Sequence, residues 1–237
     1  MEKKHIQTLS KGIKFILILL VLDFSFGYIA KQFFYNQETG KYARSTHAIK
    51  ETEADILIFG SSHAHRHYIP EVIEKELGQS CYNAGAEGQQ LVYHGALLDM
   101  VLKRYTPKTI VLNIDTDFLL EFEDAYGRLS DLHPYYSEYS QELKPVLGLR
   151  SKFVDVKLFF HLYQMNSTIM HIIRYGISPQ VDYKGYRPLF GSIKKKNNKD
   201  RIEDQNKENR GDVIDQNFVD ALKKFIAIFQ RMYHFLR

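Results

Sequence analysis

The first strong pattern along the chain is a long apolar segment near the N-terminus. Phe15–Leu22 are eight uninterrupted apolar residues, and after Asp23 the apolar character resumes up to Lys31. Lys14 precedes the segment. As a helix, these residues measure roughly 24 Å at ~1.5 Å per residue, which is short for a hydrocarbon core of about 30 Å unless the flanking lysines reach toward the headgroups. We therefore predict a transmembrane signal anchor over residues 15–31.

The residues before the apolar segment are basic. Residues 1–14 contain four lysines against one acidic residue, Glu2, so the positive-inside tendency places them in the cytoplasm and sends the remainder of the chain outward. Two alternatives stay open. One is a cleaved signal peptide, although no small-x-small cleavage site follows, and the other is a helix buried in a protein core. Asp23 carries a free-energy cost within a membrane span, so we expect it near an interface or facing a partner.

The remainder of the chain divides into a tether and a folded domain. Residues 32–53 are polar and lack a consistent period, which predicts a tether between membrane and domain. The domain is expected over residues 54–237. Within it, the aromatic-rich and then helical residues 118–193 predict an insertion or lid. Residues 194–212 contain one aliphatic residue among many charged ones, which predicts a solvated loop, and residues 215–236 repeat apolar residues at helical spacing.

Apolar runs and helical repeats alternate in the first half of the expected domain. Short apolar runs at 55–59, 81–83 and 109–114 predict strands. The segments 70–77 and 91–105 repeat apolar residues at helical spacing. This alternation is typical of the α/β class, in which a parallel sheet is wound with helices. Loops that follow the carboxyl ends of such strands converge, so we expect one site there.

Composition narrows the functional classes. The chain has 237 residues, 44% of them hydrophobic and 25% charged, which is typical of a globular protein and excludes wholesale disorder. Its 32 basic and 28 acidic residues give a net charge of +4 with no basic stripe, so nucleic acid is not an expected partner. The single cysteine, Cys81, excludes an internal disulfide and a CxxC-type zinc site.

Two loops carry candidate chemistry. The first predicted strand runs into Gly60-Ser61-Ser62-His63, and the second into Asn83-Ala84-Gly85-Ala86-Glu87-Gly88. A serine between a strand and a helix lies in the crevice at the sheet edge, where a nucleophile can share its backbone N–H with a developing oxyanion. The alternative is structural, with Ser62 as a helix N-cap and the glycines as turn residues.

Both loops resemble the first two sequence blocks of the SGNH, or GDSL, serine hydrolases, and the N-terminal anchor resembles the membrane-anchored, extracytoplasmic branch of that superfamily in bacteria. The resemblance implies a three-layer, flavodoxin-like parallel sheet with Ser62 as nucleophile and the backbone N–H of Gly88 in the oxyanion hole. Asp117 falls near the position of the third block. The candidate binding residues are His63, His67 and Asn83.

The general base of that family is a histidine in an Asp-x-x-His block near the C-terminus, and no such block is found here. Asp131-Leu132-His133 has a different spacing, and His234 follows Gln230 and Arg231. General-base assistance contributes typically ~10²–10⁴-fold in rate. We therefore expect a sheet that is incomplete at its C-terminus, and a truncated and inactive enzyme is one of the hypotheses.

Three histidines alternate in the segment His63-Ala64-His65-Arg66-His67. In an extended chain their rings would share a face, and in a helix the first and last would pair at i, i+4. Either array could hold zinc if a carboxylate joined it, but Arg66 lies among them and no HExxH pattern follows. A metal site, a role of His63 or His67 in the pocket, and ordinary surface histidines stay open; we expect no metal.

The resemblance implies an esterase or O-acyltransferase that acts on acyl esters of cell-envelope glycans and needs no cofactor. The expected partners are the lipid bilayer, through the N-terminal helix, and a cell-envelope polysaccharide. We place the C-terminal domain outside the cytoplasm of a single-pass membrane protein. The competing hypothesis is a non-catalytic envelope scaffold of the same fold, which binds a glycan or a protein through its aromatic insertion.

Overall fold

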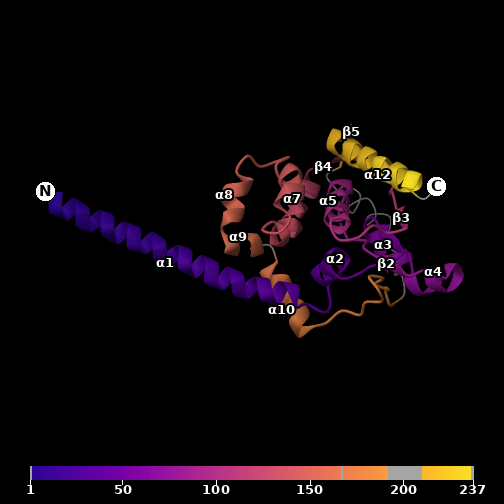
Figure 1. Cartoon of the computed structure of the whole chain (residues 1–237), viewed down its shortest axis with the longest axis horizontal. Helices are drawn as coiled ribbons and strands as arrows, with labels where there is room; N and C mark the ends of the chain where they lie inside the picture. Colours follow the sequence, from indigo (N-terminus) through magenta and orange to yellow (C-terminus); the bar gives the residue numbers. More distant parts are fainter. Residues whose placement is uncertain (1, 167, 192–209, 236–237) are drawn as a thin grey trace, which may run out of the picture. The chain divides into compact units, whose positions relative to one another are not determined.

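The computed structural model describes residues 2–166, 168–191 and 210–235 (Figure 1). The chain divides into two compact units. The anchor unit comprises residues 1–37 and 131–178, and the sheet unit comprises residues 38–130 and 179–237. Each unit is described by itself.

The sheet unit is built on three parallel strands, β1 (Ile56–Phe59), β2 (Cys81–Asn83) and β3 (Thr109–Leu112). Their order is β2-β1-β3, and both pairings are parallel. All four residues of β1 are buried, as the continuous apolar run of a central parallel strand requires. The predicted strands and the mixed α/β class are therefore confirmed; β2 has the predicted bounds, and β1 and β3 are shorter than their apolar runs. The finer expectation, a sheet of the SGNH type, stays a prediction.

Helices lie against both faces of this sheet. On one face, Ile56 and Ile58 form a buried cluster with Ala64 of α3 (Ser62–His67) and Ile73 of α4 (Pro70–Leu77). On the other face, the ring of Phe59 contacts His94 of α5 (Leu91–Leu102) and Phe225 of α12 (Gln216–Phe235). Successive residues of a strand point to opposite faces, so the two sets of helices are separated by the sheet.

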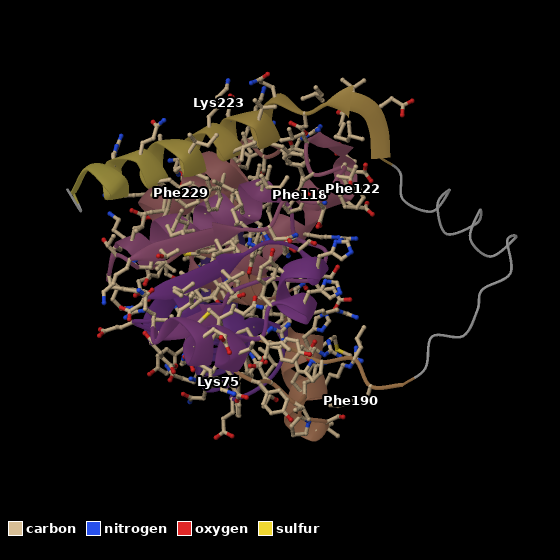
Figure 2. All side chains as sticks on the ribbon, turned by 90° about the vertical axis from the view of Figure 1, so that its right-hand side faces the viewer. Lys75, Phe118, Phe122, Phe190, Lys223 and Phe229 are labelled. Atoms are coloured by element: carbon tan, nitrogen blue, oxygen red, sulfur yellow. The ribbon has the colours of Figure 1, made fainter. Side chains whose placement is uncertain are left out.

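The C-terminal part of the sheet unit packs over α5. A second sheet pairs β4 (Leu120–Phe122) with β5 (Arg210–Ile214) in antiparallel fashion, and α6 (Glu123–Arg128) follows β4. Helix α12 packs along α5 (Figure 1). Its Phe218 and Phe225 are buried, and Lys223 projects from its outer side (Figure 2). Of the solvated loop expected at 194–212, residues 194–209 lie outside the described residues, and 210–212 belong to β5.

The segment 32–53 differs from the tether that we predicted. Helix α1 continues through Tyr35, and Lys41–Lys50 form α2, which packs against α5. The side chains of Tyr42, Ala48 and Ile49 are buried, and the Ser45 hydroxyl lies 2.8 Å from the hydroxyl of Tyr93. The segment has few apolar residues, and their spacing does not predict a helix. Burial of these residues against α5 stabilises α2.

The aromatic-rich stretch also differs from the expected binding insertion. Five of its aromatic side chains are buried, namely Phe118, Phe122, Tyr126, Tyr135 and Tyr136. Moreover, the range 118–193 does not form one body, because residues 131–178 belong to the anchor unit and the flanking parts to the sheet unit. These five rings therefore pack in the cores of the two units, whereas Phe153 and Phe190 of the same range are exposed.

The anchor unit consists of the long helix α1 (Glu2–Tyr35) and a set of short helices. The short helices include α7 (Ser140–Leu147), α8 (Val154–Phe159), α9 (His161–Met165) and α10 (Ile169–Ile177), and a 3₁₀ helix, η1 (Leu129–Tyr135), leads into them. Within the described residues, α1 is long and apolar enough to cross a membrane, with a mean hydropathy of 2.1 in its most apolar part. Most side chains of that part are exposed, whereas the alternative hypothesis of a helix buried in a protein core requires them to be buried.

Asp23, the acidic residue inside this apolar helix, caps a neighbouring helix of the anchor unit. Its carboxylate accepts hydrogen bonds from the backbone N–H of His161, at 2.8 Å, and of Leu162, at 3.2 Å. One turn later, Gly27 leaves room for this approach, because a Cβ at that position would overlap Cβ of His161. Asp23 therefore faces a partner within the chain, the first turn of α9. This agrees with the expectation that a carboxylate in an apolar span faces a partner, because burying it alone costs free energy.

Candidate functional site

The candidate site lies where the sheet changes its direction of winding. The chain passes from the central strand β1 to β2 on one side and then crosses to β3 on the other. The crevice at the carboxyl end of the central strand is where parallel sheets bind ligands. The backbone pairing extends into the loops there, since Ala86 N donates to Gly60 O and Asn113 N donates to Phe59 O, both at 2.9 Å. The predicted convergence of the three loops is therefore confirmed.

Gly60 is a point at which these loops approach each other closely. Its φ of +140° is rarely adopted by residues with a side chain. A Cβ at this position would lie 2.8 Å from Cβ of Asn113 and 2.9 Å from Cβ of Ala64. The glycine is thus needed both for the backbone turn and for the close approach of β3 and α3.

Asp115, after β3, is the centre of the polar cluster. Its carboxylate accepts hydrogen bonds from the hydroxyl of Ser61, from Nδ1 of His63 at 2.7 Å and from the side-chain amide of Asn113 at 2.9 Å. Burial alone would raise the pKa of Asp115, but the hydrogen bonds from Ser61 and His63 and the adjacent imidazole outweigh it and lower the pKa below its usual value. An ionised Asp115 therefore fixes the orientation of His63.

The two adjacent serines have different surroundings. Ser61 is the N-cap of α3, because its hydroxyl accepts a hydrogen bond from the backbone N–H of His63 at 3.2 Å. Ser62 is the first residue of α3 and is half-buried. Among the described residues, its hydroxyl has no hydrogen-bond partner. The structural alternative of an N-cap thus applies to Ser61, and the hydroxyl of Ser62 is available to a ligand.

The three histidines of α3 do not share a face. The rings of His63 and His67 stack with centroids 5.6 Å apart, and both residues are exposed. His65 is fully buried, and burial together with the charges of the neighbouring arginines lowers its pKa to about 3. In the ranges 2–166, 168–191 and 210–235, no group of three or more His, Cys, Asp and Glu side chains is arranged to hold a metal ion.

Asn83, at the end of β2, connects α3 to the second loop through hydrogen bonds to the backbone of both. Its side-chain amide donates to the carbonyls of Ala64 and Tyr68, both at 2.9 Å, and its Oδ1 accepts from the backbone N–H of Gly85 at 2.9 Å. The side chain is completely buried. Both of its donors are used by the backbone of α3 and its C-cap, so Asn83 holds the helix in place and does not face a substrate.

Gly88 ends the second loop in a left-handed conformation with φ of +73°. The guanidinium of Arg128 covers it, since Nη1 donates to the carbonyl of Gly88 at 2.7 Å and a Cβ on Gly88 would overlap that group. The preceding residue, Glu87, forms an ion pair with Arg66 of α3. The second loop is therefore attached to α3, and a cation lies beside the glycine that the resemblance assigns to the oxyanion hole.

The sequence pattern pointed to Asp117 as a site residue, whereas four other residues of this region were not predicted. Asp117 lies exposed in the turn after β3, whereas Asp115, two residues earlier, contacts Ser61 and His63. The signal for Asp115 was available in the pattern Asn113-x-Asp115, because i and i+2 residues of an extended chain lie on the same side. The other missed residues are Asn113, Arg128 and His94.

His94 lies in α5 behind the site. It is fully buried, it contacts the ring of Phe59, and neither ring nitrogen has a hydrogen-bond partner among the described residues. Burial lowers the pKa of His94 to about 3, and the nearby charge of Asp115 opposes this only in part. The ring is therefore neutral at physiological pH, and no sequence pattern distinguished it from the apolar residues of its helix.

No family model matches the chain, and neither the curated proteins nor the solved structures provide a significant match.

Proposed function

We propose that the protein is a membrane-anchored serine esterase or O-acyltransferase whose general base is His63. The observation that carries this proposal is the hydrogen bond from Nδ1 of His63 to Asp115, next to the hydroxyl of Ser62, which has no hydrogen-bond partner in the described ranges of the chain. A carboxylate bound to one ring nitrogen of a histidine fixes the tautomer in which the other nitrogen accepts a proton. This dyad takes the place of the Asp-x-x-His block that the sequence lacks.

In the proposed reaction, the hydroxyl oxygen of Ser62 attacks the carbonyl carbon of an ester and its proton passes to Nε2 of His63. The C–O bond of the ester then breaks, and the leaving alkoxide takes that proton from His63. Asp115 keeps Nδ1 protonated and stabilises the imidazolium between the two steps. Water or a sugar hydroxyl then attacks the acyl carbon and gives its proton to His63, the bond between that carbon and the Ser62 oxygen breaks, and the Ser62 oxygen takes the proton back from His63. Hydrolysis and transfer share this intermediate.

The negative charge that develops on the carbonyl oxygen needs donors nearby. The N-terminus of α3, the backbone N–H of Gly88 and the guanidinium of Arg128 are the groups that we assign to it. Arg128 already donates to the carbonyl of Gly88, which orders both groups. Support for acyl esters of envelope glycans as substrates comes from the sequence resemblance and from the candidate membrane span of α1, which would hold the site near an envelope surface.

Fluorophosphonate labelling of the full-length protein tests the proposal, because only an activated serine reacts. We expect stoichiometric labelling of the wild type, with the modified peptide containing Ser62, and no labelling of Ser62→Ala. Ser61→Ala removes the neighbouring hydroxyl, which caps α3 and donates to Asp115, so the labelling should be slower but should still fall on Ser62. Labelling at Ser61, or equal labelling of the wild type and Ser62→Ala, would contradict the assignment.

A non-catalytic scaffold that binds an envelope glycan is the second candidate. It is favoured by one observation: within the described part of the chain, no hydrogen bond joins the hydroxyl of Ser62 to His63 or His67. The same experiment separates the two functions, since a scaffold leaves the wild type and Ser62→Ala equally unlabelled while the folded protein retains its thermal transition.

A further inference from the structure

The anchor unit contains an open apolar cavity of about 610 Å³. One wall is the C-terminal part of α1, and the other is formed mainly by α10. Apart from Gly176 and Ala30, the lining consists of large apolar side chains, among them Phe26, Ile29, Phe33, Ile169, Ile173 and Ile177. This volume lies within the range of about 300–1,000 Å³ that is typical of small-molecule sites. We refer to it as the α1–α10 groove.

The groove is continuous with the part of the chain most suited to contact lipid. Its α1 wall begins at Phe26, four residues after the uninterrupted apolar segment Phe15–Leu22 ends, and the side chains of that segment are exposed except for the half-buried Leu20. A helix that crosses the bilayer there would be surrounded by acyl chains along its length. The groove therefore opens at the end of the candidate span, where lipid chains meet the interface.

The helix on the other side of the groove has the composition of an interfacial helix. Met170, Ile173 and Ile177 of α10 are each more than half exposed, which is costly in water. Arg174 is also exposed on the same short helix, where a cation can contact anionic headgroups. These features fit a helix that lies in the headgroup region with its apolar side chains turned toward lipid.

We propose that the α1–α10 groove binds one acyl chain of a bilayer phospholipid. The groove offers this chain an apolar surface, and Arg174 lies on the same helix for the phosphate of the headgroup. The inference rests on the membrane anchoring by α1 that forms part of the proposed function, and it is independent of the serine chemistry.

The test uses the full-length protein in phosphatidylcholine–phosphatidylglycerol nanodiscs that contain a phosphatidylcholine with a photoreactive diazirine near the middle of one acyl chain. After irradiation, the modified peptides are identified by mass spectrometry. We expect lipid adducts on residues 26–33 and 162–177. Gly176→Phe should fill the groove, since the space around a Cβ at that position is open to 4 Å. We expect it to reduce adducts on α10 at least fivefold.

Gly127→Phe is the matched control, because Gly127 also has open space around a Cβ and lies on α6 of the sheet unit. It should leave the adducts unchanged. Adducts confined to residues 6–22, or adducts on α10 that persist in Gly176→Phe, would each overturn the groove assignment. Loss of the protein from membranes in alkaline carbonate would overturn the anchoring itself, whereas fluorophosphonate labelling would be unaffected by either failure.

Discussion

Nδ1 of His63 lies 2.7 Å from a carboxylate oxygen of Asp115, although 52 residues separate them in the chain. The contact exists because β3 lies beside β1, so the residues after the two strands meet at the same edge of the sheet. It converts an exposed histidine at the start of a short helix into an oriented one.

Asp115→Asn should slow the fluorophosphonate reaction of Ser62 by roughly 10²–10⁴-fold, because the amide can hold His63 in the wrong tautomer and cannot stabilise the imidazolium. His63→Gln should have an effect of the same size, because His63 and Asp115 act together and either change disables the pair. The rate of labelling at neutral pH is the measurement. His67→Gln is the control, because the His67 ring stacks on His63 but is not hydrogen-bonded to Asp115. A rate for Asp115→Asn equal to that of the wild type would refute the role of the dyad.

Acid should destabilise the sheet unit through two buried histidines. Burial lowers the pKa of His65 and of His94 to about 3, from 6.5. The unfolded chain therefore binds more protons than the folded one between pH 6.5 and 3, so stability is complete above pH 6.5 and falls as the pH drops toward 3. Each histidine contributes on the order of 1 kcal/mol per pH unit in this window. Denaturant unfolding at several pH values measures the slope.

His94→Leu should reduce that slope and leave the stability at pH 7 equal or higher, because neither ring nitrogen has a partner to lose among the described residues. Thermal unfolding at pH 7 and pH 5 compares the variant with the wild type. If the variant gains stability but loses the fluorophosphonate reaction, His94 supports the reaction through its electrostatic interaction with Asp115. An unchanged pH slope would show that His94 is not the group that titrates.

Gly60→Ala should destabilise the sheet unit by roughly 2–6 kcal/mol, the sum of about 1–3 for the left-handed backbone and about 1–3 for overpacking against Asn113 and Ala64. Gly127→Ala provides the comparison, because that glycine lies in a helix with open space around it and its replacement should be neutral or stabilising by up to about 1 kcal/mol. Denaturant titrations give both values. Equal free energies of unfolding for the two variants would mean that the loops do not meet at Gly60.

Asp23→Ala should loosen α9 by about 0.5–2 kcal/mol, since it removes the acceptor for the backbone N–H groups of His161 and Leu162. Limited proteolysis of the protein in nanodiscs should then cleave near residue 161 faster than in the wild type. Ser25→Ala changes an exposed neighbour on the same helix and should not alter the cleavage rate. Cleavage that is unaffected by Asp23→Ala would contradict the cap.

The sequence predicted the parallel sheet because each of its strands is a short apolar run ended by a polar or glycine-rich turn. Helix α4 was equally predictable, since Pro70 begins it and Gly78 ends it in the left-handed conformation. The sequence did not reveal α2, whose few apolar residues are buried by contacts distant in the chain. It also missed the dyad. A motif shows residues that are adjacent in the chain, whereas Asp115 reaches His63 only through the order of the strands.

The pairing of Asp23 with His161 and Leu162 has a consequence for biosynthesis. The acceptor is made 138 residues before the first of its donors. In a chain anchored by α1, a carboxylate without these donors would have to stay hydrated, because lipid offers it no hydrogen bonds. The part of α1 around Asp23 would then stay at the water boundary until α9 is synthesised and folded, and the depth of the helix would depend on a segment translated much later.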